Sequence, residues 1–250
     1  MNLTLFKIAE KVGKKVIGGT GEEKFKDISI DSRTLEPSDL FVALKGPFND
    51  GHDYLKDAME KGAAAFVVEK KIPIYKPYIL VEDCFKFLDQ LAIFQREIFK
   101  GKVIGLTGSN GKTTTKEIIY SLLEKKGCHK TKGNKNNHIG VPLTLASLTN
   151  MQKYAVIEIG TNSPGEINNL SAKVIPDIAL IINAAASHLE RLDSVEKVAN
   201  EKSYILRHLK NDGVAVLPRD SEFFSYWKEK CVKKKDYFLW ISSRFRYLFE

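Results

Sequence analysis

Short apolar runs alternate with segments of helical periodicity along almost the whole chain. The helical segments include HDYLKDAMEKG (52–62) and CFKFLDQLAIFQREIF (84–99). Alternation of this kind is typical of α/β layers around a largely parallel sheet, so we expect an α/β fold. The runs that we expect to form strands are ISI (28–30), LFVAL (40–44), AAFVVE (64–69), YILVE (78–82), KVIGL (102–106), YAVIEIG (154–160), DIALIIN (177–183) and GVAVLP (213–218).

The helical pattern at 84–99 marks the expected boundary between two domains. A fresh strand begins just after it, at Gly101. A chain of 250 residues is long enough for two modest domains, each with its own core. We expect an N-terminal domain over 1–84, a connecting helix over 85–100 and a second domain over 101–250. The broad apolar face of the connecting helix is expected to consist of Phe85, Leu88, Leu91, Ala92 and Phe94 to Gln95.

Composition excludes some classes of protein. No run of eighteen apolar residues exists, so we expect no membrane span. The N-terminus mixes charged and apolar residues at helical spacing, unlike a signal peptide. Three scattered cysteines have neither metal-ligand spacing nor an even framework, which fits a reducing cytoplasm. We therefore expect a cytoplasmic protein.

The formal net charge of +8 raises the question of nucleic-acid binding. The lysines are spread along the chain rather than gathered in one arm, which argues against a nucleic-acid partner. The densest run, KEKCVKKKD (228–236), is interpreted as a solvated helix end and turn, and the aromatic-rich chain end is strand-like. Phosphorylated, acidic small molecules suit the same charge.

The stretch VIGLTGSNGKTTTKEIIYSLL (103–123) predicts a phosphate site. A short buried strand over 103–106 leads into a turn with two glycines, and a helix follows from Lys112 until Gly127 stops it. A strand, a glycine turn and a helix N-terminus together bind anions. Lys112 would neutralise phosphate charge, and the Thr113 hydroxyl would ligate the Mg²⁺ that accompanies ATP. The alternative is a strand–helix turn that merely contains Gly-Lys-Thr. The expected apolar face of this helix is Ile118, Ile119, Leu122 and Leu123.

Glu158 stands at the carboxyl end of the apolar strand YAVIEIG. A nucleotide site of this type needs an acid at the end of a neighbouring strand to hold the metal, and a buried, unpaired carboxylate is costly. We therefore predict that Glu158 is a metal ligand. The alternatives are an exposed strand edge or an acid paired with a nearby lysine.

Four stretches resemble the Mur ligase family of peptidoglycan synthesis: TGSNGKTTTKE, GNKNNHIGVPLTL, EIGTNSPGEI and SHLERLDSVEKVANEKSYIL. That family uses a shortened phosphate-loop pattern, G-x-x-G-K-[ST], which residues 108–113 match; the longer pattern would require a glycine where Leu106 stands. Within the family, the chain is most similar to the members that add D-Ala-D-Ala to UDP-MurNAc-tripeptide. The residues that favour this subgroup are Glu190, the run 194–199 and the block GNKNNHIG (133–140).

The resemblance implies an ATP-dependent amide ligase that works through an acyl phosphate, with ATP and Mg²⁺ as cofactors. It implies catalytic roles for Lys112, His188 and Lys202. Without the resemblance, the sequence favours a structural role for His188 and a surface position for Lys202. The implied ATP-binding residues are Gly108, Ser109, Asn110, Gly111, Lys112, Thr113, Thr114, Asn136 and Asn137, although capping would explain the two asparagines. The implied metal ligands are Thr113, Glu158, His188 and Lys202, the last as a carbamate formed on an unprotonated amine.

The segment DSRTLEPSDLFVALKGPFNDGHDYLKDAMEKGAAAFVVE (31–69) is similar to the family domain that holds the UDP part of the substrate. Without the resemblance, the residues of DSR (31–33) and NDGH (49–52) would be interpreted as ordinary turn-forming residues. The resemblance therefore implies a small N-terminal UDP-binding domain followed by an ATP-binding domain of the phosphate-loop type. The implied substrate-binding residues are Asp31, Ser32, Arg33, Asn49, Asp50, Gly51 and His52.

The resemblance covers roughly residues 1–225. Family members usually have GxAVLNxDD where this chain has GVAVLPRDSEF, with Pro218 in place of the asparagine. They also continue through the rest of the ATP-binding domain and a C-terminal domain, which we expect this chain to lack. We expect the chain to be a monomer. Three alternatives follow: a ligase that adds the third peptide residue, a folylpolyglutamate synthetase, which the UDP-binding segment disfavours, or a non-catalytic module that binds nucleotides or UDP-sugars.

Overall fold

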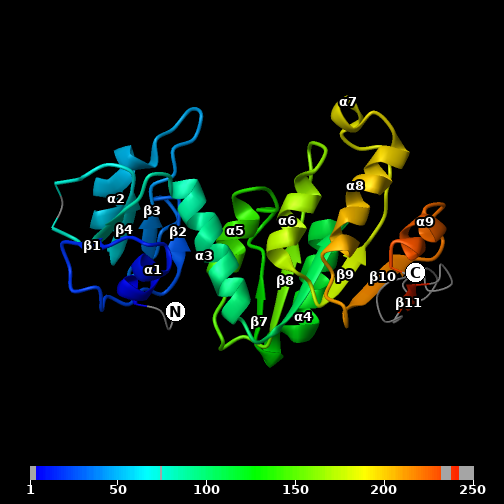
Figure 1. Ribbon diagram of the computed structural model, residues 1–250, viewed down its shortest axis with the longest axis horizontal. Coiled ribbons are helices and arrows are strands. Elements are labelled where there is room, and N and C mark those ends of the chain that lie inside the picture. Colours follow the sequence, from blue (N-terminus) through cyan, green and yellow to red (C-terminus); the bar gives the residue numbers. More distant parts are fainter. Residues whose placement is uncertain (1–3, 74, 232–237, 242–250) are drawn as a thin grey trace. The chain divides into compact units, whose positions relative to one another are not determined.

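The computed structural model describes residues 4–73, 75–231 and 238–241. It divides into two compact α/β units, each with one sheet (Figure 1). Unit 1 comprises the described residues up to Ile98 together with 145–149, and unit 2 comprises the rest. The expected α/β class with largely parallel sheets is confirmed.

Unit 1 is a five-stranded sheet with short helices. Its strand order is β1 (Val16–Ile17), β5 (Tyr78–Leu80), β4 (Ala65–Val68), β3 (Leu40–Val42) and β2 (Ile28–Ser29). Every neighbouring pair is parallel except β1 with β5. The core on one side includes Phe41 and Phe66, whose rings meet edge to face. The helices are α1 (Leu5–Lys11), the 3₁₀ turn η1 (Gly51–Tyr54), α2 (Leu55–Glu60) and α3 (Cys84–Ile98).

Helix α3 groups with unit 1, and its buried face differs slightly from the prediction. Leu88, Leu91 and Ala92 are buried as expected. Phe87 is buried, whereas Phe85 and Phe94 are only half-buried. Periodicity correctly located the stripe, but it did not decide which ring at the edge of the stripe turns inward.

Unit 2 is a six-stranded, fully parallel sheet. Its strand order is β11 (Phe238–Ile241), β10 (Val214–Pro218), β9 (Ile178–Ile181), β6 (Lys102–Thr107), β8 (Tyr154–Glu158) and β7 (Cys128–Lys130). Its helical segments are α4 (Lys112–Leu123), η2 (Glu124–Lys126), α5 (Gly140–Ala146), α6 (Glu166–Val174), α7 (Leu189–Leu192), α8 (Val195–Arg207) and α9 (Phe224–Glu229).

All eight runs that the sequence marked as strands are strands. Strands β1 and β7 were not predicted, because they have only two or three residues, none of them buried, and so give no clear alternation. The expected strand at the chain end corresponds to β11, which pairs with β10. Most of the lysine-rich run, together with the last nine residues, falls in 232–237 and 242–250, outside the described residues.

The helices of unit 2 cover both faces of its sheet. Helix α4 connects β6 to β7 in one direction, whereas α6 and α8 follow connections in the opposite direction. Right-handed crossovers therefore place α4 on one face and α6 with α8 on the other (Figure 1). Alternation along β6 agrees: Ile104 packs with Ile119 of α4, whereas a Cβ on Gly105 would lie 3.4 Å from Ile205 of α8.

The predicted apolar face of α4 is only half used. Ile119 and Leu123 pack against the sheet core. Ile118 and Leu122 are 56% and 73% exposed in this structure. Two of the four residues of the expected apolar face therefore pack inward, and the other two are exposed.

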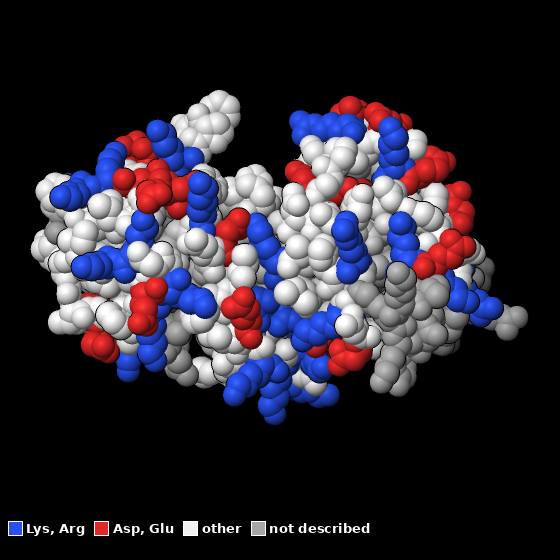
Figure 2. Space-filling model, viewed as in Figure 1, with Lys and Arg blue, Asp and Glu red and all other residues white. Residues whose placement is uncertain are grey.

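Charged side chains are distributed over both units. Figure 2 shows Lys and Arg mixed with Asp and Glu on the visible face, with a gathering of Lys and Arg at the lower edge of unit 2. Exposed Lys125 and Lys126 of η2 are near the end of α4. In the described part of the chain, none of the helices combines the length and the apolar character that crossing a membrane requires.

Candidate nucleotide and metal site

The phosphate loop lies at the point where the strand order of the unit 2 sheet reverses. Strand β6 has β8 on one side and β9 on the other, and the loop follows its carboxyl end. Ligands of open α/β sheets bind at such a point. Gly111 caps α4 with φ +77°, a conformation that other residues rarely adopt, and no side chain caps this helix. Its first-turn N–H groups are therefore left uncapped by side chains.

Lys112 folds back over the loop that precedes it. Its Nζ donates to the carbonyl oxygens of Gly108 and Ser109, at 2.7 and 3.1 Å. Burial lowers the pKa of the Lys112 ammonium, and the charge of Glu158 partly opposes this. The ammonium is thus held beside the loop, where an incoming phosphate would find it.

The segment between β9 and α7 holds the phosphate loop in place. The amide oxygen of Asn183 accepts from the backbone N–H groups of Ser109 and Asn110, at 3.0 and 3.1 Å. The Ser109 hydroxyl contacts the Ala185 backbone and lies 3.0 Å from the hydroxyl oxygen of Ser187. The sequence prediction missed Asn183, although its position at the end of DIALIIN was a usable signal.

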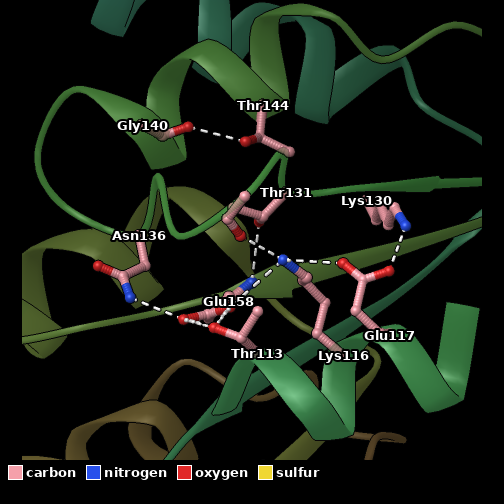
Figure 3. A network of polar contacts seen from close by, with 10 residues as sticks. Thr113, Lys116, Glu117, Lys130, Thr131, Asn136, Gly140, Thr144 and Glu158 are labelled. Carbon is pink, nitrogen blue, oxygen red and sulfur yellow. Dashed lines mark hydrogen bonds and ion pairs between the residues drawn. The ribbon is translucent and has the colours of Figure 1, made fainter.

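Glu158 is the buried centre of a polar network (Figure 3). It is 1% exposed, and period-two alternation places it on the face of the sheet that carries α4. Its oxygens accept from the Thr113 hydroxyl at 3.1 and 3.3 Å, and Oε1 accepts from the Asn136 amide at 2.7 Å. Gly160 makes room for this amide, because a Cβ there would lie 2.5 Å from Asn136 Oδ1. The structure therefore brings together three residues that the sequence singled out.

Lys116, which the sequence prediction missed, is the buried cation of the same network. Its side chain is 0% exposed, and Nζ lies 3.5 Å from Glu158 Oε2 and 3.3 Å from Glu117 Oε1. Nζ also donates to the Gly133 carbonyl oxygen. Glu158 thus has the lysine partner that we left open as an alternative, while it also adjoins Thr113.

The donor set around Glu158 fits Mg²⁺. A carboxylate and a hydroxyl are hard oxygen donors, and Mg²⁺ commonly binds through one or two protein groups plus waters and substrate phosphates. The described residues contain no group of three or more His, Cys, Asp or Glu side chains able to hold a metal by itself. Two protein oxygen donors leave the other coordination positions of Mg²⁺ to waters and to the phosphates of a nucleotide.

Lys202 is buried on α8, not at the surface. It is 2% exposed, and its pKa is lowered to about 8, first by burial and then by the positive charge of Lys112. Lys202 therefore has the partly unprotonated amine that carbamylation requires.

The neighbouring Glu201 accepts from the backbone N–H groups of Gly165 and Ile167, at 2.8 and 2.9 Å, and so caps α6.

His188 and two ATP-site candidates have simpler surroundings. His188 is exposed with φ +54° at the start of α7, and within the described residues no hydrogen bond joins it to Glu158 or Lys202. Thr114 is exposed. Asn137 Oδ1 accepts from the backbone N–H groups of residues 139 and 140 at the start of α5, the capping role that we considered. Roles in ligand binding for these residues stay predictions.

The predicted substrate residues of unit 1 form two internally bonded turns. Arg33 makes two hydrogen bonds to the Asp31 carboxylate, at 2.9 and 2.8 Å, while its side chain stays 86% exposed. His52 Nδ1 lies 2.6 Å from Asp50 Oδ1, and its Nε2 accepts from the Glu69 N–H at 2.9 Å. Burial raises the pKa of Asp50, but hydrogen bonds from His52 outweigh this and hold it below its usual value.

The remaining members of this set differ in exposure. Ser32 is buried, and Asn49 is exposed. Gly51 must be glycine, because a Cβ would lie 2.8 Å from the backbone at Ala43. Both ring nitrogens of His52 are engaged within the unit, so its clearest role is to fix the turn.

Family models match both units of the chain. The Mur ligase middle domain matches residues 106–244, and the Mur ligase family catalytic domain matches residues 24–96. The first match alone spans more than half of the chain. The chain belongs to the Mur ligase family.

Individual Mur ligases extend this finding. A UDP-N-acetylmuramoyl-tripeptide–D-alanyl-D-alanine ligase of Buchnera aphidicola is 39% identical over 247 residues, which are 95% of this chain and 54% of the relative. MurF of Acinetobacter baumannii superposes with a TM-score of 0.83 at 33% identity, over 96% of this chain and 53% of that one. MurF of Thermotoga maritima, solved with ADP, superposes with a TM-score of 0.70 at 33% identity, over 86% and 50%. The chain spans about half the length of the relatives that it matches.

Proposed function

We propose that this chain supplies the UDP-substrate and ATP-phosphate sites of a peptidoglycan-precursor ligase. The reaction is the ATP-dependent joining of D-Ala-D-Ala to UDP-MurNAc-tripeptide through an acyl phosphate. The observation that carries the proposal is the contact of Thr113 and Asn136 with the buried carboxylate of Glu158, beside a phosphate loop whose helix no side chain caps. The names of the similar ligases support the choice of substrates.

The chain's own residues have distinct tasks in this proposal. The loop over 108–111 and the first turn of α4 would bind the phosphates through backbone N–H groups. Lys112 would turn from its carbonyl partners toward the phosphate charge. Thr113 and Glu158 would hold Mg²⁺, which when bound screens the negative charge between nucleotide and carboxylate.

We further propose that Lys202 becomes a carbamate. Its buried position and lowered pKa supply the unprotonated amine, and the carbamate would be a carboxylate-like group near Lys112. His188, at the strained start of α7, would be a further metal ligand.

Unit 1 would hold the UDP part of the substrate. The exposed guanidinium of Arg33 stands ready for a phosphate, while Asp31 fixes its direction. The expected domain bounds 1–84, 85–100 and 101–250 remain part of the proposal, as does the monomeric state.

Phosphate release tests the proposal. The 250-residue chain is incubated with Mg-ATP, UDP-MurNAc-tripeptide and D-Ala-D-Ala, and each substrate is omitted in turn. Release that needs all three and disappears in Lys112→Ala would establish the ligase. Binding of UDP-MurNAc-tripeptide without release would leave a binding module, and absence of both would refute the proposal.

A further inference from the structure

Lys116 has a burial that its sequence position does not explain. It follows Lys112 by one helical turn on α4, yet it is among the largest fully buried side chains of the described residues. A buried ammonium is costly unless it is paired and hydrogen-bonded. Its partners are the Gly133 carbonyl and the carboxylates of Glu158 and Glu117.

The charges of this cluster balance in the absence of a divalent cation. Glu117 is about half-exposed and also pairs with Lys130, which holds the pKa of Glu117 below its usual value. Lys130 is therefore the closer partner of Glu117. This leaves the fully buried Lys116 as the cation opposite the fully buried Glu158 (Figure 3).

Lys116 and the two other groups that contact Glu158 approach different parts of its carboxylate. Lys116 lies 3.5 Å from Oε2, whereas Asn136 contacts Oε1 and Thr113 reaches both oxygens. Three neutral or cationic groups therefore already fix the carboxylate. Orientation alone does not require Lys116. Its ammonium forms an ion pair with Glu158, whereas Lys112 acts on Glu158 only through its charge and donates its own hydrogen bonds to the loop.

We propose that Lys116 is a built-in counter-cation of the metal site. It balances Glu158 when no divalent cation is bound, so the phosphate loop can accept a nucleotide before the metal. The inference rests on the proposed function, because it assigns the loop to a nucleotide and Glu158 to its metal. It adds Lys116 as a residue that acts through its charge and contacts neither the nucleotide nor the metal.

The proposal predicts opposite effects on nucleotide and metal. In Lys116→Met, an unbalanced carboxylate faces the phosphate loop, so metal-free ADP binds about tenfold more weakly. The same unbalanced carboxylate attracts a divalent cation, so Mn²⁺ alone binds about tenfold more tightly. A purely structural lysine would weaken both, because losing it would loosen the whole site.

The test measures ADP binding in EDTA by fluorescence competition, and Mn²⁺ binding without nucleotide by electron paramagnetic resonance. Lys126→Met removes an exposed lysine from the adjoining η2 and is the matched control, with both affinities unchanged. Breaking a buried ion pair strongly destabilises a fold, so circular dichroism checks each variant.

The double variant Lys116→Met/Glu158→Gln decides the question if the single variant does not fold. It removes both charges, so metal-free ADP binding should return to within about threefold of the wild type while Mn²⁺ binding is lost. Persistently weak ADP binding in the double variant, or weaker Mn²⁺ binding in the single variant, would overturn the proposal. If the wild-type chain binds ADP neither with Mg²⁺ nor without it, the proposed function itself fails.

Discussion

At the scale of single residues, Lys202 lies in surroundings that differ from those of an ordinary surface lysine. Burial of the Lys202 side chain and the neighbouring charge of Lys112 both disfavour its protonated form. An unfolded lysine has a pKa of about 10.4, so folding lowers the affinity of Lys202 for its proton. The free energy of unfolding therefore depends on pH even when no ligand is bound.

We predict that stability due to Lys202 rises with pH. Between a folded pKa of about 8 and the unfolded value, the unfolded chain binds more protons, so the free energy of unfolding increases with pH. The gain between pH 7 and pH 9 is about 1 kcal/mol. Urea unfolding of the wild type and of Lys202→Met, in buffers free of carbon dioxide, measures it.

The stability difference between the two proteins isolates Lys202 from other titrating groups. Lys202→Met should be the more stable protein at pH 7, and its advantage should shrink at pH 9. A difference that stays constant across this range would show that the Lys202 ammonium is not disfavoured in the folded chain.

The Thr113 hydroxyl gives a second prediction at this scale. Thr113→Val keeps the shape of the side chain but removes the oxygen that contacts Glu158. We expect Mg²⁺ to strengthen ADP binding about ten- to a hundredfold less than in the wild type, in line with the loss of a metal-site group. Calorimetric titrations with and without Mg²⁺ measure this ratio.

Ser121→Ala is the control for that variant. It removes a hydroxyl from the same helix, where Ser121 donates only to the Ile118 carbonyl. An unchanged Mg²⁺ effect in Thr113→Val would mean that the hydroxyl does not ligate the metal.

At the scale of elements, helix α6 depends on a residue from another helix. Gly165 stands at its N-cap and offers no side chain, so Glu201 of α8 accepts from the N–H groups of Gly165 and Ile167 instead. A carboxylate near a helix N-terminus is also favoured by the helix dipole. This contact joins the helix that carries Lys202 to its neighbour.

We predict that Glu201→Gln destabilises the protein by about 1–3 kcal/mol, because the amide offers one acceptor to two buried donors. Urea unfolding at pH 7 measures the change in the free energy of unfolding. Glu196→Gln, at the exposed first turn of the same helix, should stay within about 0.5 kcal/mol. Equal losses in both variants would contradict the capping role.

Several elements of the site could be predicted from the sequence because position alone distinguishes their residues. Thr113 follows the loop lysine, and Glu158 interrupts an apolar strand, so each stands out in its stretch. Lys116 and Glu201 do not stand out, since one lysine or glutamate on a charged helix resembles another. Their roles arise from contacts with segments seventeen to forty-two residues away, which no local pattern contains.

The same limit explains the elements that were missed. Strand β7 has three half-buried residues and exists because it pairs with β8. The apolar pattern of α4 indicated a helix correctly, but sequence periodicity could not tell that only Ile119 and Leu123 meet the sheet. Burial at such positions depends on what packs against the helix.

At the scale of the whole molecule, the chain consists of two units with separate cores and separate proposed ligands. Unit 2 contains the phosphate loop, Glu158 and Lys202, and unit 1 contains the DSR and NDGH turns. The chain spans about half the length of related ligases. Nucleotide binding is the property that depends on the residues of unit 2 alone.

The most direct measurement is a calorimetric titration of ADP, with Mg²⁺, into the 250-residue chain and into Lys112→Ala. The account predicts one ADP per chain and an affinity at least tenfold weaker in the variant, because Lys112 supplies the cation at the loop. Absence of binding to the wild-type chain, or equal affinity in the two proteins, would contradict the assignment of this loop to a nucleotide.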